Sequence, residues 1–236
     1  MRALILAAGR GERMRPLTDD VPKPLLMAGD RRLIEWQLDR LARAGIRDLV
    51  INIAHLPEQF EAVLGTGERY GVTLTYSREG GQADDALETL GGIVRALPLL
   101  DGTPFVVVSG DIVTDFDYET LQRPAAAIIA GSADAHLVLV DNPAFHVHGD
   151  MGCVDGRIDP DAPQRLTYAN IGIFAPRLFK GLLPVRARLF PWLYAAARAG
   201  RVTGEHFRGR WYNVGTPAEL ARLDADLRTF GLEPSL

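Results

Sequence analysis

The stretch LAAGRGERMRPLTDDVPKPL, residues 6–25, overlaps the end of a short apolar run at residues 3–8. It contains two glycines, three arginines, one lysine and three prolines. The apolar run is typical of a buried β-strand, and the segment after it combines backbone freedom with fixed positive charge. This combination at the end of a strand predicts a loop that binds phosphate groups.

Short β-branched runs alternate with amphipathic stretches through the first half of the chain. Strands are expected at residues 3–8, 48–53, 72–76 and 105–109, and helices at 33–44, 57–64 and 87–97. This alternation predicts an α/β, Rossmann-like fold with a mostly parallel central sheet and helices on both faces.

The second half of the chain is less regular. Strands are expected at residues 136–140 and 169–174, and helices at 189–199 and 218–230. The alanine-rich stretch at residues 123–135 is interpreted as a connection on the surface.

Composition excludes several classes of protein. The chain has 236 residues, of which 47% are apolar, and this suits one domain with a sizeable core. A net charge of −4 gives no indication of a nucleic-acid or membrane partner. Cys153 is the single cysteine, and no apolar run approaches the roughly 18 residues of a membrane span. We expect a cytoplasmic protein that acts on small molecules, and its oligomeric state stays open.

The loop after the first strand leaves the edge of the sheet where parallel-sheet proteins bind ligands. Gly9 and Gly11 allow the backbone to approach a ligand closely, and Arg13 and Lys23 bring positive charge to the same place. Met14 occupies the position of the third glycine of a dinucleotide fingerprint, and no P-loop pattern occurs. A solvated basic turn is the alternative, but a lysine between two prolines favours a binding loop.

Three segments resemble the signature of the sugar-1-phosphate nucleotidyltransferases: LAAGRGERMRPLT-x-x-x-PKPL, SGD at residues 109–111 and GRWYNVGTP at 209–217. Within that family, LVLVDNPAFH (137–146), GEHFRGRW (204–211) and Glu12 are most similar to the short bacterial N-acetylmuramate-1-phosphate uridylyltransferases. The resemblance covers nearly the whole chain. It implies one catalytic domain, with a nucleotide-binding half at residues 1–122 and a sugar-phosphate-binding half at 123–236 that includes a small sugar lobe.

The resemblance implies transfer of a uridylyl group from UTP to N-acetylmuramate 1-phosphate, with release of pyrophosphate, in cell-wall recycling. Arg13 would hold the β- and γ-phosphates, and Lys23 would stabilise the α-phosphate, so both are the expected catalytic residues. The expected nucleotide contacts are Leu6, Ala7, Ala8, Gly9, Gly11, Glu79 and Gln82.

Magnesium is the expected cofactor, because Mg²⁺ is bound by one or two carboxylates together with phosphate oxygens. Asp111 follows a buried strand through Gly110 and would emerge at the ligand edge of the sheet. Relatives often supply a second carboxylate from a W-x-D-V-G-T motif, whereas this chain reads WYNVGT, with Asn213. An amide oxygen can coordinate Mg²⁺ but adds no charge, so the number of metal ions stays open.

Residues that contact the sugar phosphate are expected in the segment LETLGGI, residues 87–93, and in the second half of the chain. The expected sugar-phosphate contacts are Glu88, Gly91, Asp150, Asn170 and Arg188. Many relatives present a lysine to the sugar phosphate, and here Arg157 and Arg188 are the alternatives. The segment HVH at residues 146–148 is interpreted as a loop near the sugar pocket, with a metal site as the alternative.

Two other functions stay open. One is transfer of a uridylyl, thymidylyl or guanylyl group to another hexose 1-phosphate. The other is a non-catalytic sensor of nucleotide sugars on the same scaffold, which Leu90 and Asn213 would favour. The presence of Arg13, Lys23 and Asp111 argues against the sensor.

Overall fold

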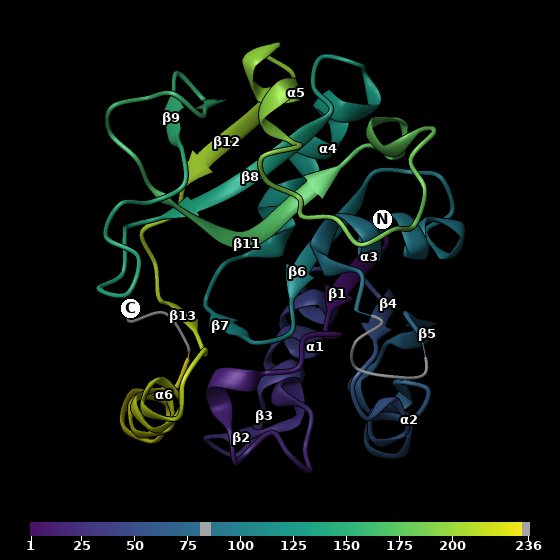
Figure 1. Cartoon of the computed structure of the whole chain (residues 1–236), viewed down its shortest axis with the longest axis vertical. Coiled ribbons are helices and arrows are strands. Elements are labelled where there is room, and N and C mark those ends of the chain that lie inside the picture. The colour runs from purple at the N-terminus through teal and green to yellow at the C-terminus, as the bar shows by residue number, and fades with distance from the viewer. Residues whose placement is uncertain (81–85, 233–236) are drawn as a thin grey trace.

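A nine-stranded mixed sheet forms the centre of the molecule, with helices on both of its faces (Figure 1). The computed structural model that shows it describes residues 1–80 and 86–232, so Gln82 lies outside the described residues. The strand order is β5-β4-β1-β6-β11-β8-β12-β10-β9. The expected α/β fold is confirmed.

The first half of the chain supplies four parallel strands, which are β1 (Ala3–Leu6), β4 (Asp48–Ile53), β5 (Thr73–Arg78) and β6 (Phe105–Ser109). β1 lies between β4 and β6, and its last residue, Leu6, pairs with Asn52 on one side and with Ser109 on the other. The carboxyl ends of three strands therefore meet at one edge of the sheet, where ligands of such folds bind.

The second half continues the same sheet from β6 onward. Its strands are β8 (Ala135–Val140), β9 (Gly152–Val154), β10 (Arg157–Asp159), β11 (Thr167–Phe174) and β12 (Val202–His206). β11 runs antiparallel to both β6 and β8, while β12 runs parallel to β8. The sheet is therefore parallel in the first half of the chain, as predicted, and contains both parallel and antiparallel strand pairs in the second half.

Two short ribbons lie outside the main sheet. One pairs β2 (Met27–Ala28) with β3 (Arg31–Arg32), and the other pairs β7 (Ile112–Thr114) with β13 (Trp211–Asn213). In the second ribbon Asn213 pairs with Ile112, and the backbone N–H of Val214 donates to the carbonyl of Asp111 at 3.0 Å. This pairing brings the segment after residue 212 beside the loop that carries Asp111.

The helices divide between the two faces because successive strand residues point to opposite sides. Ala3 and Ile5 of β1 pack in one core with α1 (Leu33–Arg43), α2 (Pro57–Leu64) and α4 (Gln122–Ile129). Leu4 packs in the other core with α3 (Glu88–Ala96) and α5 (Tyr194–Arg198).

A third, smaller core joins α6 (Pro217–Phe230) to the loop that follows β1. Met14 is fully buried there together with Leu223 of α6. Thr216 caps α6, since its hydroxyl accepts from the backbone N–H of Glu219, and Pro217 occupies the first turn. The buried Met14 anchors the loop from within, which leaves its neighbour Arg13 exposed to the ligand side.

Two elements differ from expectation. The stretch interpreted as a surface connection contains α4, because alanine favours helix and Ile128 is buried in the core. The helix expected at residues 189–199 is only α5, Tyr194–Arg198, since Pro191 cannot donate the backbone hydrogen bond of a continuous helix. Among residues 1–80 and 86–232, no helix is long and apolar enough to cross a membrane.

Candidate active site

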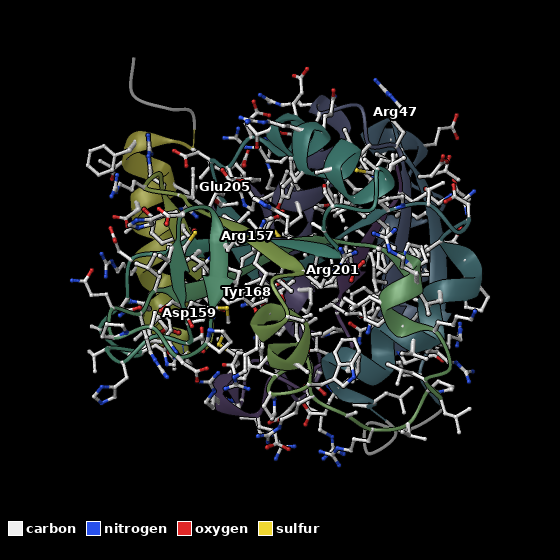
Figure 2. All side chains as sticks on the ribbon, turned by 90° about the horizontal axis from the view of Figure 1, so that it is seen from above. Arg47, Arg157, Asp159, Tyr168, Arg201 and Glu205 are labelled. Carbon is white, nitrogen blue, oxygen red and sulfur yellow. The ribbon has the colours of Figure 1, made fainter. Side chains whose placement is uncertain are left out.

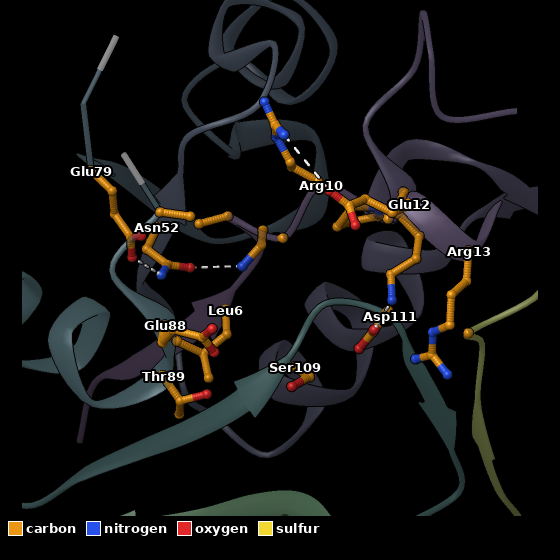
Figure 3. Close-up of a pocket in the computed structure, with 18 of the residues that line it drawn as sticks. Leu6, Arg10, Glu12, Arg13, Asn52, Glu79, Glu88, Thr89, Ser109 and Asp111 are labelled. Atoms are coloured by element: carbon orange, nitrogen blue, oxygen red, sulfur yellow. Dashed lines mark hydrogen bonds and ion pairs between the residues drawn. The ribbon is translucent and has the colours of Figure 1, made fainter. Parts of the chain in front are cut away.

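A cavity of about 630 Å³ opens where β1, β4 and β6 end (Figure 3). Ten of the expected site residues line it: Leu6, Ala7, Ala8, Gly9, Gly11, Arg13, Lys23, Glu79, Glu88 and Asp111. Further lining residues, not assigned to the site from sequence, include Arg10, Asn52, Thr89, Ser109, Arg186 and Gly215. The loop after β1 and the carboxyl ends of β4 and β6 therefore line the same cavity.

Gly11 gives the loop after β1 its shape. Its backbone has φ +65°, and a Cβ atom at this position would lie 3.0 Å from Cγ2 of Thr18 and 3.1 Å from Cβ of Lys23. The hydroxyl of Thr18 donates to the Gly11 carbonyl at 2.8 Å. Glycine is therefore needed for the loop to fold back on itself, and this fold brings Lys23 to the cavity.

Lys23 and Asp111 form an ion pair in the cavity. Their side chains are 14% and 19% exposed, so the pair is largely shielded from solvent while still lining the hollow. Lys23 lies between two prolines and begins a short helical turn, whereas Asp111 lies shortly after the end of β6. Two segments distant in sequence therefore bring an ammonium and a carboxylate to one point, which is the chemistry expected where a metal–phosphate group binds.

Arg13 differs from the other cations of the cavity. Arg10 lies 3.6 Å from Glu12, and Arg186 lies 3.6 Å from Glu88. Arg13 has no hydrogen bond or ion pair with any residue in the described part of the chain, and its guanidinium packs close to Gly215, where a Cβ atom would lie 3.1 Å from Nη2. An exposed guanidinium without a carboxylate partner is available to bind an anion.

Asn52 and Glu79 connect the walls of the cavity through hydrogen bonds (Figure 3). The side-chain carbonyl of Asn52 accepts from the backbone N–H of Ala7 at 2.6 Å, and its amide donates to Glu79. Glu79 also accepts from the backbone N–H of Leu87 at 2.8 Å. Burial raises the pKa of Glu79, against the opposing effect of these hydrogen bonds.

Gly91 lies inside α3 and does not line the cavity. A Cβ atom there would lie 2.2 Å from the carbonyl oxygen of Val185, so glycine permits the segment at residues 184–187 to pack directly on the helix. The backbone N–H of Ala187 donates to the Leu87 carbonyl at 3.0 Å and fixes this packing. The same segment places Arg186 at the cavity, whereas Arg188 is exposed and lies outside it.

Asn213 lines a second cavity, of about 580 Å³, which lies between the segment after β8 and the start of α6. The β7–β13 pairing keeps its backbone beside that of Ile112, but its side chain does not line the first cavity. The structure therefore does not bring Asn213 together with Asp111 in one hollow.

Asp150 and Asn170 also lie outside the first cavity. Asp150 accepts from the backbone N–H of Tyr168 at 2.8 Å and lies 3.0 Å from His146. Asn170 has φ +56° at an irregularity of β11. Arg157, the alternative sugar-phosphate contact, lies on β10 among the outer strands, and its guanidinium donates to the carbonyl of Gly200 at 2.5 Å (Figure 2).

No group of three or more histidine, cysteine, aspartate or glutamate side chains that could hold a metal ion occurs among the residues the structure describes. Asp111 offers one carboxylate to the cavity, where Lys23 already pairs with it. This donor set suits Mg²⁺ that is bound mainly by phosphate oxygens, with a single protein carboxylate completing the site.

Comparison with known proteins identifies the family. Residues 2–151 match the family described as Nucleotidyl transferase. Over 231 residues the chain is 45% identical to the N-acetylmuramate alpha-1-phosphate uridylyltransferase of Neisseria meningitidis serogroup B, and the match covers 95% of this chain and 97% of that one. The chain belongs to the nucleotidyl transferase family. The resemblance inferred from the arginine-rich loop is thereby confirmed.

Other nucleotidyl transferases support the same assignment. The N-acetylmuramate alpha-1-phosphate uridylyltransferase of Caulobacter vibrioides is 34% identical over 236 residues, which cover 96% of each chain. A solved structure of a putative glucose-1-phosphate thymidylyltransferase from Bacillus anthracis superposes with a TM-score of 0.84 over 99% of this chain and 98% of that one. Its sequence is 20% identical, so this likeness concerns the fold alone.

Proposed function

We propose that the protein transfers a uridylyl group from UTP to N-acetylmuramate 1-phosphate, giving UDP-N-acetylmuramate and pyrophosphate. The observation that carries this proposal is the 45% identity, along almost the whole of both chains, to a relative named for this reaction. The cavity supports it, because the loop after β1, Arg13, Lys23 and Asp111 line one hollow. The reaction would serve cell-wall sugar recycling in the cytoplasm, with small molecules as the only substrates.

The reaction is an in-line displacement at the α-phosphorus of the triphosphate. A phosphate oxygen of the sugar phosphate forms the new bond, and the bond between the α-phosphorus and its bridging oxygen to the β-phosphate breaks. The attacking oxygen is already ionised at neutral pH, so the protein need not supply a nucleophile or a general base. Its task is to position two polyanions and to neutralise their charge.

The cavity contains the groups for this task. The exposed guanidinium of Arg13 binds the β- and γ-phosphates and then the leaving pyrophosphate, because it has no carboxylate to compete with them among the described residues. Lys23 lies deeper, paired with Asp111, and stabilises the charge that develops at the α-phosphate. The backbone of residues 6–9 receives the nucleoside.

Mg²⁺ would be held by Asp111 together with oxygens of the triphosphate. When bound, it withdraws charge from the phosphates and lowers the barrier to attack. Since Lys23 occupies one carboxylate oxygen of Asp111, the empty site attracts a free cation weakly. We therefore expect Asp111 to bind the metal chiefly as its complex with the triphosphate.

The sugar phosphate would approach from the side formed by Glu88 and Arg186. Glu88 has φ +59° at the start of α3, and Arg186 is 70% exposed at the rim. We infer that residues 1–122 bind the nucleotide and that residues 123–236 complete the sugar side. In this arrangement Arg186, rather than Arg188, meets the anionic acceptor.

A panel of nucleoside triphosphates and sugar 1-phosphates, measured as pyrophosphate release with Mg²⁺, tests the proposal. We expect UTP with N-acetylmuramate 1-phosphate to give the highest kcat/KM. Equal use of N-acetylglucosamine 1-phosphate would rule out the specific acceptor, and preference for another triphosphate would rule out UTP. Absence of pyrophosphate with every pair would indicate a sensor instead of an enzyme.

A further inference from the structure

Three residues form a compact buried contact behind the nucleotide loop, which we call the amide latch: Asn52, Glu79 and Gly92. The side chain of Asn52 joins β4 to the loop after β1 through Ala7, and Glu79 joins the end of β5 to the start of α3 through Leu87. Asn52 is 3% exposed and Glu79 is 6% exposed, so these hydrogen bonds are shielded from water. Buried polar networks of this kind are costly when any member is left unpaired.

Glu79 determines which way the Asn52 amide points. An ionised carboxylate only accepts hydrogen bonds, so the NH₂ end of Asn52 must face Glu79 and the carbonyl end must face Ala7. The other carboxylate oxygen accepts from the backbone N–H of Leu87 at 2.8 Å, which holds Glu79 itself in place. A flipped amide would place oxygen against oxygen at Glu79 and N–H against N–H at Ala7.

Gly92 provides the space for these two side chains. A Cβ atom at this position would lie 2.4 Å from Oε1 of Glu79 and 2.7 Å from Nδ2 of Asn52, both far inside ordinary contact distance. Gly92 lies in α3, where glycine is unfavourable for the helix. The space that the latch requires therefore explains why glycine occupies position 92, where helix formation alone would disfavour it.

We propose that Asn52 is a positioning residue, which acts through the Ala7 amide to hold residues 7–9 where the nucleoside binds, while Glu79 and Gly92 hold Asn52. This inference rests on the proposed function, because it takes the ligand of residues 7–9 to be the nucleoside of a triphosphate. Glu79 lines the cavity itself, and in this proposal it also acts on the nucleotide through Asn52. Arg13, Lys23 and Asp111 have no hydrogen bond to the latch within the described residues, so it governs binding more than the chemical step.

The first test separates binding from turnover. Asn52→Ala should raise KM for UTP about tenfold, the scale of one lost buried hydrogen bond, while kcat changes less than about threefold. Thr167→Val is the control, because it removes a partly buried hydrogen bond to Asn142, 2.8 Å long, in the other half of the chain. It should lower the melting temperature and leave KM for UTP unchanged.

If Asn52→Ala does not fold, Glu79→Gln replaces it as the test variant. This change preserves the shape of the latch but removes one hydrogen-bond acceptor. Binding of UTP by titration calorimetry gives the same comparison without turnover. A KM and Kd for UTP equal to those of the wild type, in either folded variant, would overturn the proposal. Wild-type protein that binds UTP but releases no pyrophosphate would contradict the proposed reaction and leave the latch standing.

The second test needs no substrate. Gly92→Ala should lower the melting temperature of the wild type, because its Cβ atom meets the two latch side chains. In an Asn52→Ala, Glu79→Ala background the space is open, and the same change should raise the melting temperature, since alanine favours helix over glycine. An equal decrease in both backgrounds would show that Gly92 does not serve the latch.

Discussion

Lys23 and Asp111 form their ion pair across 88 positions of sequence, and both side chains are largely shielded from solvent. Pro22 and Pro24 flank the lysine, and β6 ends just before Gly110 and the aspartate. The structure thus aims a cation at the proposed site of charge development before any substrate arrives. Preorganisation of this kind is the main source of electrostatic catalysis.

Lys23→Ala should lower kcat/KM by about a hundredfold or more, the effect of one lost electrostatic donor. The matched control is Lys180→Ala, because Lys180 is the other lysine of the chain and is exposed outside the cavity. Steady-state kinetics of both variants measure the effect. Equal loss in the two variants, or wild-type turnover in Lys23→Ala, would remove Lys23 from the mechanism.

Asp111→Asn should reduce activity at least a hundredfold and weaken metal binding, because it removes the carboxylate proposed to hold Mg²⁺. Asn213→Asp should leave the metal affinity of the free protein within about twofold of wild type, since residue 213 lines the other cavity. Titration of Mn²⁺ into the wild type and both variants measures this. Metal binding that tightens tenfold in Asn213→Asp would show that this side chain reaches the metal.

Arg186→Ala should raise KM for the sugar phosphate about tenfold, because a charged hydrogen bond to the acceptor is lost. KM for UTP should change little. Arg188→Ala is the control, two positions along the same segment but outside the cavity, and it should change either KM less than twofold. If Arg188→Ala has the larger effect, the acceptor approaches from a different side.

The raised pKa of Glu79 predicts a pH dependence of stability. Burial raises this pKa above 4.5, so the folded protein binds the proton more tightly than the unfolded chain does. The contribution of Glu79 to stability therefore increases as pH falls through its folded pKa toward 4.5. Glu79→Gln lacks the group, so the difference in unfolding free energy should move in favour of the wild type from pH 7 to about pH 4.5. Urea unfolding at several pH values measures it, and a flat or opposite trend contradicts the assignment.

The part of the cavity at the ends of β1 and β6 could be predicted because its residues follow apolar strands directly. Phe105–Ser109 is a continuous β-branched run, so its end and the position of Asp111 were clear from the sequence. The loop from Gly9 to Lys23 was similarly marked by its glycines and fixed charges. Asn52 gave a weaker signal, because it is a single polar residue in the buried run LVINI, residues 49–53. Its role depends on the pairing of Asn52 with Leu6.

The positions of Arg186 and Asn170 could not be derived in the same way. Arg186 lies in a segment without regular structure, and its position depends on the close contact between Val185 and Gly91. Asn170 belongs to an antiparallel strand, for which no rule places ligands at the carboxyl end. Periodicity gives no information about either residue, since both positions are decided by packing between distant segments.

The paired glycines of α3 limit which residues this helix can carry. Each glycine in a helix costs roughly 0.5 to 1 kcal/mol relative to alanine, so Gly91 and Gly92 together sacrifice about 1 to 2 kcal/mol of helical stability. One glycine admits the backbone of Val185 and the other admits the side chains of Asn52 and Glu79. Alanine, the substitution that would most readily strengthen an isolated helix, would here collide with the carbonyl of Val185 at one position and with Asn52 and Glu79 at the other. Two adjacent glycines thus let two separate parts of the cavity lining, Asn52 with Glu79 and the segment that carries Arg186, pack closely on one helix.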